Sequence, residues 1–313
     1  MHANVLRYFI EVARQGSIRK ASNALNISSS AVNRQLLQLE QELGSALFER
    51  LPRGVRLTPA GEVLKQHVND TLTGFERARS EIGAFRGLKT GHVRISALNS
   101  LMTEFLPDAI AAFHHQHPAV TYTLKLTGAN DAIEDILTGK ADIALAFALR
   151  DSRAMHVAAE IETPVGVIMS PSHQLAQEKK LRLADCAKYP LILQPGRLPM
   201  RSQLGDELIA AGAGVPPFCE TDSIEFVRNA AKRNLGIAFF TQVGFLRELE
   251  QGELLHIPLV DRGLGNLRLG AIVPANRRNT IAGEALLTSI CEALHDLGRR
   301  CQRLAKTTRR DNT

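Results

Sequence analysis

The segment from Gly16 to Gly44, GSIRKASNALNISSSAVNRQLLQLEQELG, predicts two short helices joined by a tight turn. Ser17 and Ser28 are suitable N-caps, because a serine hydroxyl can accept a hydrogen bond from a free amide of the first turn. Between the helices, Asn26 tolerates the left-handed backbone conformation that a turn requires. Apolar residues recur at helical spacing in two stripes: Ala21, Ala24 and Leu25, then Val32, Leu36, Leu39 and Leu43. The first domain is therefore expected to be helical and built around this helix-turn-helix.

The second predicted helix carries short polar side chains and one guanidinium at its amino end. These lie opposite the apolar stripe: Ser29, Ser30, Asn33 and Arg34. Such groups can read base edges from a helix that lies in the major groove of DNA. An ordinary helical hairpin with a solvated face would show the same composition, so these residues alone leave both interpretations open.

The flanking sequence favours DNA binding. An amphipathic helix is predicted upstream from its apolar positions: Val5, Phe9, Val12 and Ala13. Downstream, residues 47–50 and 55–57 predict two short strands around a turn at 52–54. We expect a β-hairpin wing whose basic residues, Arg50, Arg53 and Arg56, meet phosphate or the minor groove while the helix reads the major groove.

From about Leu6 to Gly61 the sequence resembles, without a gap, the amino-terminal winged helix-turn-helix of LysR-type transcriptional regulators. The resemblance rests on LRYFIEVARQGSIRKASNALNISSSAVNRQLLQLEQELGSALFERLPRGVRLTPAG. Members of that family usually carry Gln where this chain has Ser29 and Ser where it has Asn33. Both positions face DNA in the family, so these departures bear on which operator sequence is read.

A long helix is predicted to follow, with Thr58 as its cap and Pro59 in its first position. Proline has no backbone N–H, but at this position an N–H would have no partner within the helix. Its apolar positions alternate four and three residues apart: Leu64, Val68, Thr71, Phe75, Ala78, Ile82 and Phe85. A helix packed on its own domain would also show a stripe. The strict alternation instead favours a coiled coil with a second chain, with Leu64, Val68, Phe75, Ile82 and Phe85 as dimerisation residues. The resemblance implies the same role for a linker helix here, and a homodimer or homotetramer that reads a two-fold symmetric site.

The sequence changes character after the glycine-bounded segment 87–91. Strands are predicted at 93–97, 120–126, 142–148, 164–169, 190–193, 236–240 and 267–273, with helices around 106–113, at 130–137, after Met200, at 223–232 and at 281–297. This alternation predicts open α/β sheets covered by helices on both faces. The LysR resemblance implies two lobes linked by crossing strands, similar to periplasmic binding proteins, with a small-molecule effector bound between them.

The expected fold class is therefore α/β, and the chain is expected to divide into four consecutive parts. A winged helix-turn-helix DNA-binding domain (1–58) precedes a linker and dimerisation helix (59–87). A two-lobed, periplasmic-binding-protein-like effector-binding domain (88–300) and a basic tail (301–313) follow. Lobe one is expected at about 91–162 and 267–300, and lobe two at about 163–266.

Ligands of open α/β sheets bind at the carboxyl ends of strands, where helix amino termini offer free amides. Polar residues at such places are predicted to bind the effector: Asn99, Ser100, Asn130, Arg201, Ser202 and Thr241. Hydroxyls, amides and one guanidinium suit a small carboxylate. The same residues could serve only as helix caps and loop residues.

Charge separates the expected domains. Residues 1–90 hold 13 Lys and Arg against 8 Asp and Glu, and residues 298–313 hold 6 against 1. These two parts carry net charges of +5 each, and the whole chain carries +6, so residues 91–297 carry −4 and are mildly acidic. Only a DNA-binding module needs to attract phosphate, so this distribution fits a DNA reader with a separate sensing domain. A solvated end is the simpler interpretation of the basic tail.

Other site classes find little support. The four cysteines, Cys186, Cys219, Cys291 and Cys301, lack zinc spacing, and the last two would lie roughly 15 Å apart on one helix, too far for a disulfide. His114, His115 and His117 could bind a metal but also suit the end of a helix. No nucleophile elbow, phosphate loop or His-Glu-x-x-His motif is present, so we expect no enzyme, metal or cofactor.

A ligand-responsive transcription factor is the predicted function. Its expected partners are a double-stranded DNA operator, a small-molecule effector and further copies of itself, with RNA polymerase as another candidate. No run is long enough to span a bilayer, so we expect a cytoplasmic protein without a membrane partner. A solute-binding protein and a two-lobed α/β enzyme with a DNA-binding head are the alternatives, and an assay for turnover would separate the enzyme from a sensor.

Overall fold

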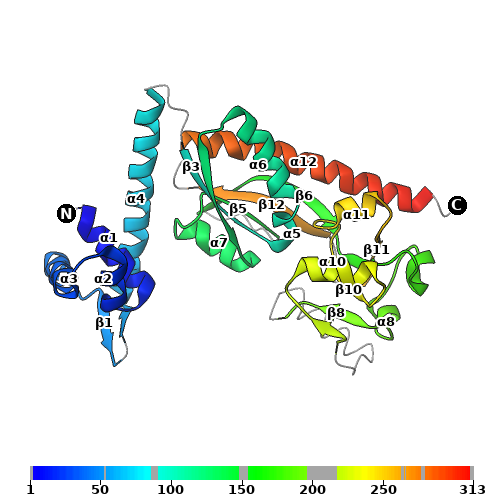
Figure 1. Cartoon of the computed structure of the whole chain (residues 1–313), viewed down its shortest axis with the longest axis horizontal. Coiled ribbons are helices and arrows are strands. Elements are labelled where there is room, and N and C mark those ends of the chain that lie inside the picture. Colours follow the sequence, from blue (N-terminus) through cyan, green and yellow to red (C-terminus); the bar gives the residue numbers. More distant parts are fainter. Residues whose placement is uncertain are drawn as a thin grey trace. The chain divides into compact units, whose positions relative to one another are not determined.

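A computed structural model describes residues 3–52, 54–85, 91–147, 154–195, 217–261, 264, 266–275 and 279–310. The chain forms two compact units, Met1–Phe85 with Thr138–Lys140, and Arg86–Leu137 with Ala141–Thr313 (Figure 1). Three of the predicted site residues, Arg53, Arg201 and Ser202, fall outside the described residues, as does the helix expected after Met200.

The first unit is a winged helix-turn-helix. Its elements are α1 (Ala3–Gln15), α2 (Ile18–Leu25), α3 (Ser29–Leu43), the antiparallel hairpin of β1 (Phe48–Leu51) and β2 (Gly54–Leu57), and α4 (Pro59–Phe85). The predicted caps are confirmed: Ser17 accepts from the amide of Lys20, and Ser28 from that of Ala31. Asn26 has φ 55° and Gly44 has φ 65°, so both end their helices in the left-handed conformation.

One hydrophobic core joins all of these elements. Its fully buried members are Leu6, Phe9, Val12, Ala21, Val32, Leu36, Leu39, Leu47, Leu64 and Val68. Phe9 of α1 and Phe48 of β1 bring their ring centroids to 5.3 Å, which fixes the hairpin against the helices. The wing is therefore packed as part of the domain.

The second unit contains two five-stranded mixed sheets. The first has the order β4 (Val120–Leu126), β3 (Gly91–Ala97), β5 (Ile143–Phe147), β12 (Asn266–Pro274) and β6 (Met155–Pro164). β4, β3 and β5 are parallel, whereas β12 runs antiparallel to both β5 and β6. We call this sheet and its helices lobe one.

The central strand β5 of lobe one is buried on both faces. Because side chains alternate across a strand, Ile143 and Leu145 face α6 (Phe105–Gln116) and α12 (Ile281–Arg310), whereas Ala144 and Ala146 face α7 (Ala129–Leu137). The short helix α5 (Asn99–Met102) follows β3. The final helix, expected at 281–297, extends to Arg310 and so includes most of the basic tail. Cys301 is buried in this core.

Lobe two is built on the second sheet. Its strand order is β11 (Leu255–Pro258), β7 (Gly166–Met169), β10 (Ile237–Phe240), β8 (Leu191–Leu193) and β9 (Cys219–Glu220). The helix α10 (Ile224–Lys232) packs on one face, and the 3-10 helix Gln174–Gln177 and α8 (Leu183–Cys186) pack on the other. The chain passes between the lobes from β6 to β7 and from β11 to β12, and α11 (Leu246–Glu250) follows β10. The two-lobed α/β prediction is thus confirmed.

Candidate functional site

The amino end of α3 presents polar groups outward. Ser29, Ser30 and Arg34 are exposed and Asn33 is half-buried. The opposite face of the helix is held in the core by Val32, Leu36 and Leu39. This division follows from the helical spacing of the apolar residues, which leaves the intervening polar side chains available to a partner.

Two of these polar residues also make contacts inside the unit. The Ser29 hydroxyl lies 2.7 Å from that of Ser22, a buried residue of α2. The Asn33 carboxamide oxygen accepts from Nη2 of Arg50 at 3.1 Å, which joins α3 to the wing. Ser29 thus helps to hold α2 against α3, and Asn33 fixes the wing arginine, roles that the sequence did not indicate.

The wing is further tied to α3 by Glu40. One oxygen of its carboxylate accepts from the amides of Leu47 and Phe48, at 2.7 and 3.1 Å. On the other strand, the Val55 amide donates to the Gly16 carbonyl at 2.9 Å. A carboxylate that accepts two backbone amides is a strong anchor because these are charge-assisted hydrogen bonds. The wing and α3 are therefore presented together.

The wing arginines differ in their surroundings. Arg56 is exposed and pairs with Glu49 across the hairpin at 2.7 Å, whereas Arg50 reaches α3. A surface pair of this kind contributes little to stability, so it can exchange for a phosphate contact.

The linker helix α4 divides into two parts. Leu64 and Val68 lie in the core of the first unit, so they are occupied within the chain. Phe75 and Ile82 are 63% and 57% exposed, so the described structure leaves both side chains open to a partner. The side chain of Phe85 falls outside the described part of the chain. The alternative interpretation, a helix packed on its own domain, fits Leu64 and Val68, and the dimerisation seam stays a prediction.

The predicted effector residues of lobe one lie at the carboxyl ends of neighbouring strands. Asn99 and Ser100 open α5 after β3, and Asn130 stands in the first turn of α7 after β4. The two strand ends are adjacent, since the amide of Thr127 donates to the carbonyl of Ala97 at 3.0 Å. Asn99 and Ser100 are half-buried and Asn130 is exposed.

The segment of lobe two that follows β10 lies against Asn99 and Ser100 of lobe one. Thr241 is buried there, and Gly244, with φ 92°, packs against lobe one. A Cβ at Gly244 would lie only 2.9 Å from Cβ of Ser100, so only glycine fits at this contact. The side-chain Nδ2 of Asn99 donates to the backbone carbonyl of Asp222 at 2.8 Å, just before α10. Asn99, Ser100 and the segment of Thr241 are therefore brought together, whereas sequence reasoning missed Asp222 and Gly244.

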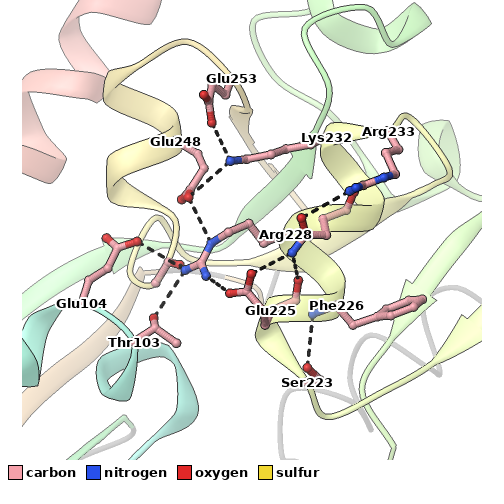
Figure 2. A network of polar contacts seen from close by, with 12 residues as sticks. Thr103, Glu104, Ser223, Glu225, Phe226, Arg228, Lys232, Arg233, Glu248 and Glu253 are labelled. Carbon is pink, nitrogen blue, oxygen red and sulfur yellow. Dashed lines mark hydrogen bonds and ion pairs between the residues drawn. The ribbon is translucent and has the colours of Figure 1, made fainter.

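A polar network lies beside this contact (Figure 2). Arg228 of α10 approaches Glu248 of α11 and also Thr103 and Glu104 of lobe one. Burial raises the pKa of the Glu104 carboxyl, the charge of Glu248 raises it further, and the Arg228 guanidinium opposes both effects. No spacing in the sequence indicated this network.

The cysteines and histidines singled out in the sequence lie in surroundings that favour a structural role. The four cysteines are free, and burial raises the pKa of both Cys186 and Cys301 to about 12, which leaves them as thiols. The His117 ring stacks on Phe113 at the end of α6. Within the described ranges, His, Cys, Asp and Glu form no group of three or more that could hold a metal ion. Of the helices that these ranges cover, none has the length and apolar character that crossing a membrane requires.

Both units match known families. Residues 86–294 match the LysR substrate binding domain, and residues 3–62 match the bacterial regulatory helix-turn-helix protein of the lysR family. The transcriptional regulator YwbI of Bacillus subtilis (strain 168) is 30% identical, over 82% of this chain and 85% of its own length.

Two solved structures share the fold. A full-length OxyR variant from Pseudomonas aeruginosa has a TM-score of 0.67 and 19% identity, covering 93% of this chain and 94% of its own. Full-length CbnR, solved with its target DNA, has a TM-score of 0.58 and 18% identity, covering 94% and 100%. At sequence identities this low, the similarity to both structures shows a shared fold and nothing more.

Proposed function

Because the chain belongs to the LysR family of transcriptional regulators, we propose that it binds a specific DNA operator through α3 and its wing, under the control of a small-molecule effector. The observation that carries the proposal is the exposed polar end of α3, with the wing anchored beside it by Glu40 and Arg50. This presents a reading helix and a phosphate-contacting hairpin as one rigid surface.

Within this surface Arg34 is the proposed reader of base edges. Its side chain is exposed on the turn of α3 that also carries Ser30. Arginine pairs with two acceptors of guanine in the major groove, a contact that distinguishes base pairs. Arg50, Arg53 and Arg56 of the wing are proposed to meet phosphate, and Ser29 and Asn33 to complete the face toward DNA.

The regulator is proposed to act as a homodimer or homotetramer. Phe75 and Ile82 of α4 lie seven residues apart, which places them on one face of a helix, and both are exposed. Pairing α4 with its copy would bury these rings and methyl groups, with Phe85 continuing the seam. Two winged modules joined in this way would recognise a two-fold symmetric operator.

The effector is proposed to be a small anion bound between the lobes. Asn99 and Ser100 from lobe one offer amide and hydroxyl donors, and Asn130 adds an exposed amide at the start of α7. Thr241 borders the site from lobe two, with Arg201 and Ser202 as proposed charged and polar contacts. These six residues offer hydrogen-bond donors and include no Asp or Glu that would repel an anion. Such a set suits a carboxylate ligand.

A regulatory role is preferred to an enzymatic one because both units match regulator families. We assign the protein no reaction and place it in the cytoplasm, where operator DNA and RNA polymerase are found.

Selection of DNA by the full-length protein tests the proposed function. Duplexes retained by the wild-type protein from a random-sequence library are expected to share a two-fold symmetric motif. Retention without any enriched motif would contradict sequence-specific recognition.

The effector site has a test of its own. A panel of small mono- and dicarboxylates is titrated by calorimetry into the wild-type protein and Ser100→Ala. Loss of one hydroxyl donor is expected to weaken the best ligand by about 1–3 kcal/mol, with effector-free affinity for the selected duplex unchanged. Equal ligand affinity in both proteins would place the site elsewhere.

A further inference from the structure

One buried guanidinium joins three segments of the second unit. Arg228 lies in the middle of α10, and its side chain is only 9% exposed. Nη2 donates to the carbonyl of Gly244 at 2.6 Å and reaches Glu104 and Thr103 of lobe one, each at 3.4 Å. Nε lies 3.2 Å from Oε1 of Glu248. Figure 2 shows Thr103, Glu104 and Glu248 converging on Arg228.

Arg228 therefore contacts both sides of the contact between Ser100 and Gly244. From lobe two it binds the carbonyl of Gly244, the residue that packs on Ser100. From lobe one it reaches Thr103, which ends the short helix α5 that Asn99 and Ser100 begin. Moving the guanidinium would remove a polar contact from both partners of this contact together.

The charges around Arg228 favour its place at the junction. Within the described part of the chain, four carboxylates, Glu104, Glu225, Glu248 and Glu253, form ion pairs with Arg228 and Lys232, and the charge of Arg247 also acts on Glu104. Glu104 belongs to lobe one, whereas Glu248 is buried in lobe two. Without the guanidinium these two carboxylates would repel one another across the junction, since Glu248 would keep only Lys232 as an ion-pair partner and Glu104 would lose Arg228.

We propose that Arg228 is a positioning residue that locks lobe one to lobe two through Glu104 and Gly244 and so holds Ser100 in its place at the effector site. The proposal rests on the effector site proposed above. An effector at Ser100 would then act on a junction that Arg228 holds together with the hydrogen bond from Asn99 to Asp222 and the burial of Val243 and Leu246 in the core of lobe one. Weakening the lock would let the lobes change their arrangement without effector.

Hydrogen exchange of the full-length protein, with no metabolite and no DNA added, tests the lock. Arg228→Gln is expected to raise exchange of the amides of residues 99–105 and 242–247 by about tenfold or more, because local opening controls exchange. Strands β5 and β8 are expected to keep wild-type rates. Arg228→Lys keeps the charge without the planar fork and is expected to recover only part of the protection.

Glu104→Gln separates a lock between lobes from a merely structural role of Arg228. This variant removes the ion pair but also the repulsion, so alone it is expected to raise exchange of residues 99–105 only a few-fold. Added to Arg228→Gln it is expected to restore protection toward that of Glu104→Gln alone. Glu225→Gln is the matched control, since Glu225 pairs with the same guanidinium from within α10 and is 61% exposed.

Three outcomes would overturn the lock. The first is unchanged exchange of residues 99–105 in Arg228→Gln. The second is an equal rise in the exchange of β5 and β8 in that variant. The third is exchange in the double variant that stays as fast as in Arg228→Gln alone. Since effector and DNA are absent from the experiment, neither a failed search for an operator nor an unchanged ligand affinity in Ser100→Ala would alter this result, and the lock and the effector site can fail separately.

Discussion

Protonation of His256 is expected to destabilise the second unit in mild acid. The ring is buried within lobe two, where Nε2 donates to the Phe240 carbonyl at 3.2 Å. Burial lowers the pKa of His256 from 6.5 to about 4, against the opposing effect of this hydrogen bond. Gly166 leaves room for the ring, since a Cβ there would collide with it.

The sign and size of the effect follow from these two pKa values. Because the folded pKa lies below the unfolded one, the unfolded chain takes up the proton first. The stabilisation is therefore complete above pH 6.5 and is lost as the pH falls from 6.5 toward 4. The loss approaches ~3 kcal/mol in total, of which about 2 kcal/mol falls between pH 7 and pH 5.

Comparison with His256→Gln isolates this titration from all others. Glutamine keeps a donor for the Phe240 carbonyl and has no titratable nitrogen. Chemical unfolding of wild type and variant, followed by circular dichroism at pH 7, 6 and 5, gives the difference in their free energies of unfolding. That difference is expected to shift by about 2 kcal/mol in favour of the variant as the pH falls. An unchanged difference at all three pH values would show that protonation of His256 does not destabilise the second unit.

Three further predictions concern the wing, the lobe junction and the linker. Glu40→Ala should lower the free energy of unfolding of the first unit by about 1–3 kcal/mol, because two backbone amides lose their acceptor, whereas Glu40→Gln should retain most of it in the same unfolding experiment. Gly244→Ala should destabilise the second unit more than Gly252→Ala, since both have positive φ but only Gly244 is packed against Ser100; equal losses in thermal unfolding would argue against that contact. Phe75→Asp should abolish the dimer in sedimentation and leave the winged unit folded, whereas Val68→Asp should unfold it; a Phe75→Asp dimer would rule out the proposed seam.

The winged helix-turn-helix could be predicted from sequence because its signals are local. Ser17, Asn26, Ser28 and Gly44 determine where helices begin and end, and each acts on amides or carbonyls within a few residues. The apolar stripe of α3 then determines which face is buried. Contacts that close this domain, such as Glu40 with the wing amides, join residues whose spacing carries no such signal.

The effector-binding unit was predictable at the level of alternating strands and helices. β6 was missed although Glu160 and Glu162 alternate with buried residues, because it lies at the edge of its sheet and its apolar run is short. The lobe junction could not be predicted, because Arg228 and Glu104 are brought together only by the tertiary fold. The linker stripe was periodic throughout, but periodicity alone does not tell a seam within the chain from one between chains.

Base recognition by α3 is the central claim, and Arg34→Ala tests it most directly. Affinity is measured for the duplex selected by wild-type protein and for a scrambled duplex of the same composition, with Arg233→Ala of lobe two as a control that removes the same charge. Arg34→Ala is expected to weaken binding of the selected duplex by about 1–3 kcal/mol and binding of the scrambled duplex far less. Equal weakening of both duplexes, or an equal effect of Arg233→Ala, would contradict base recognition by α3.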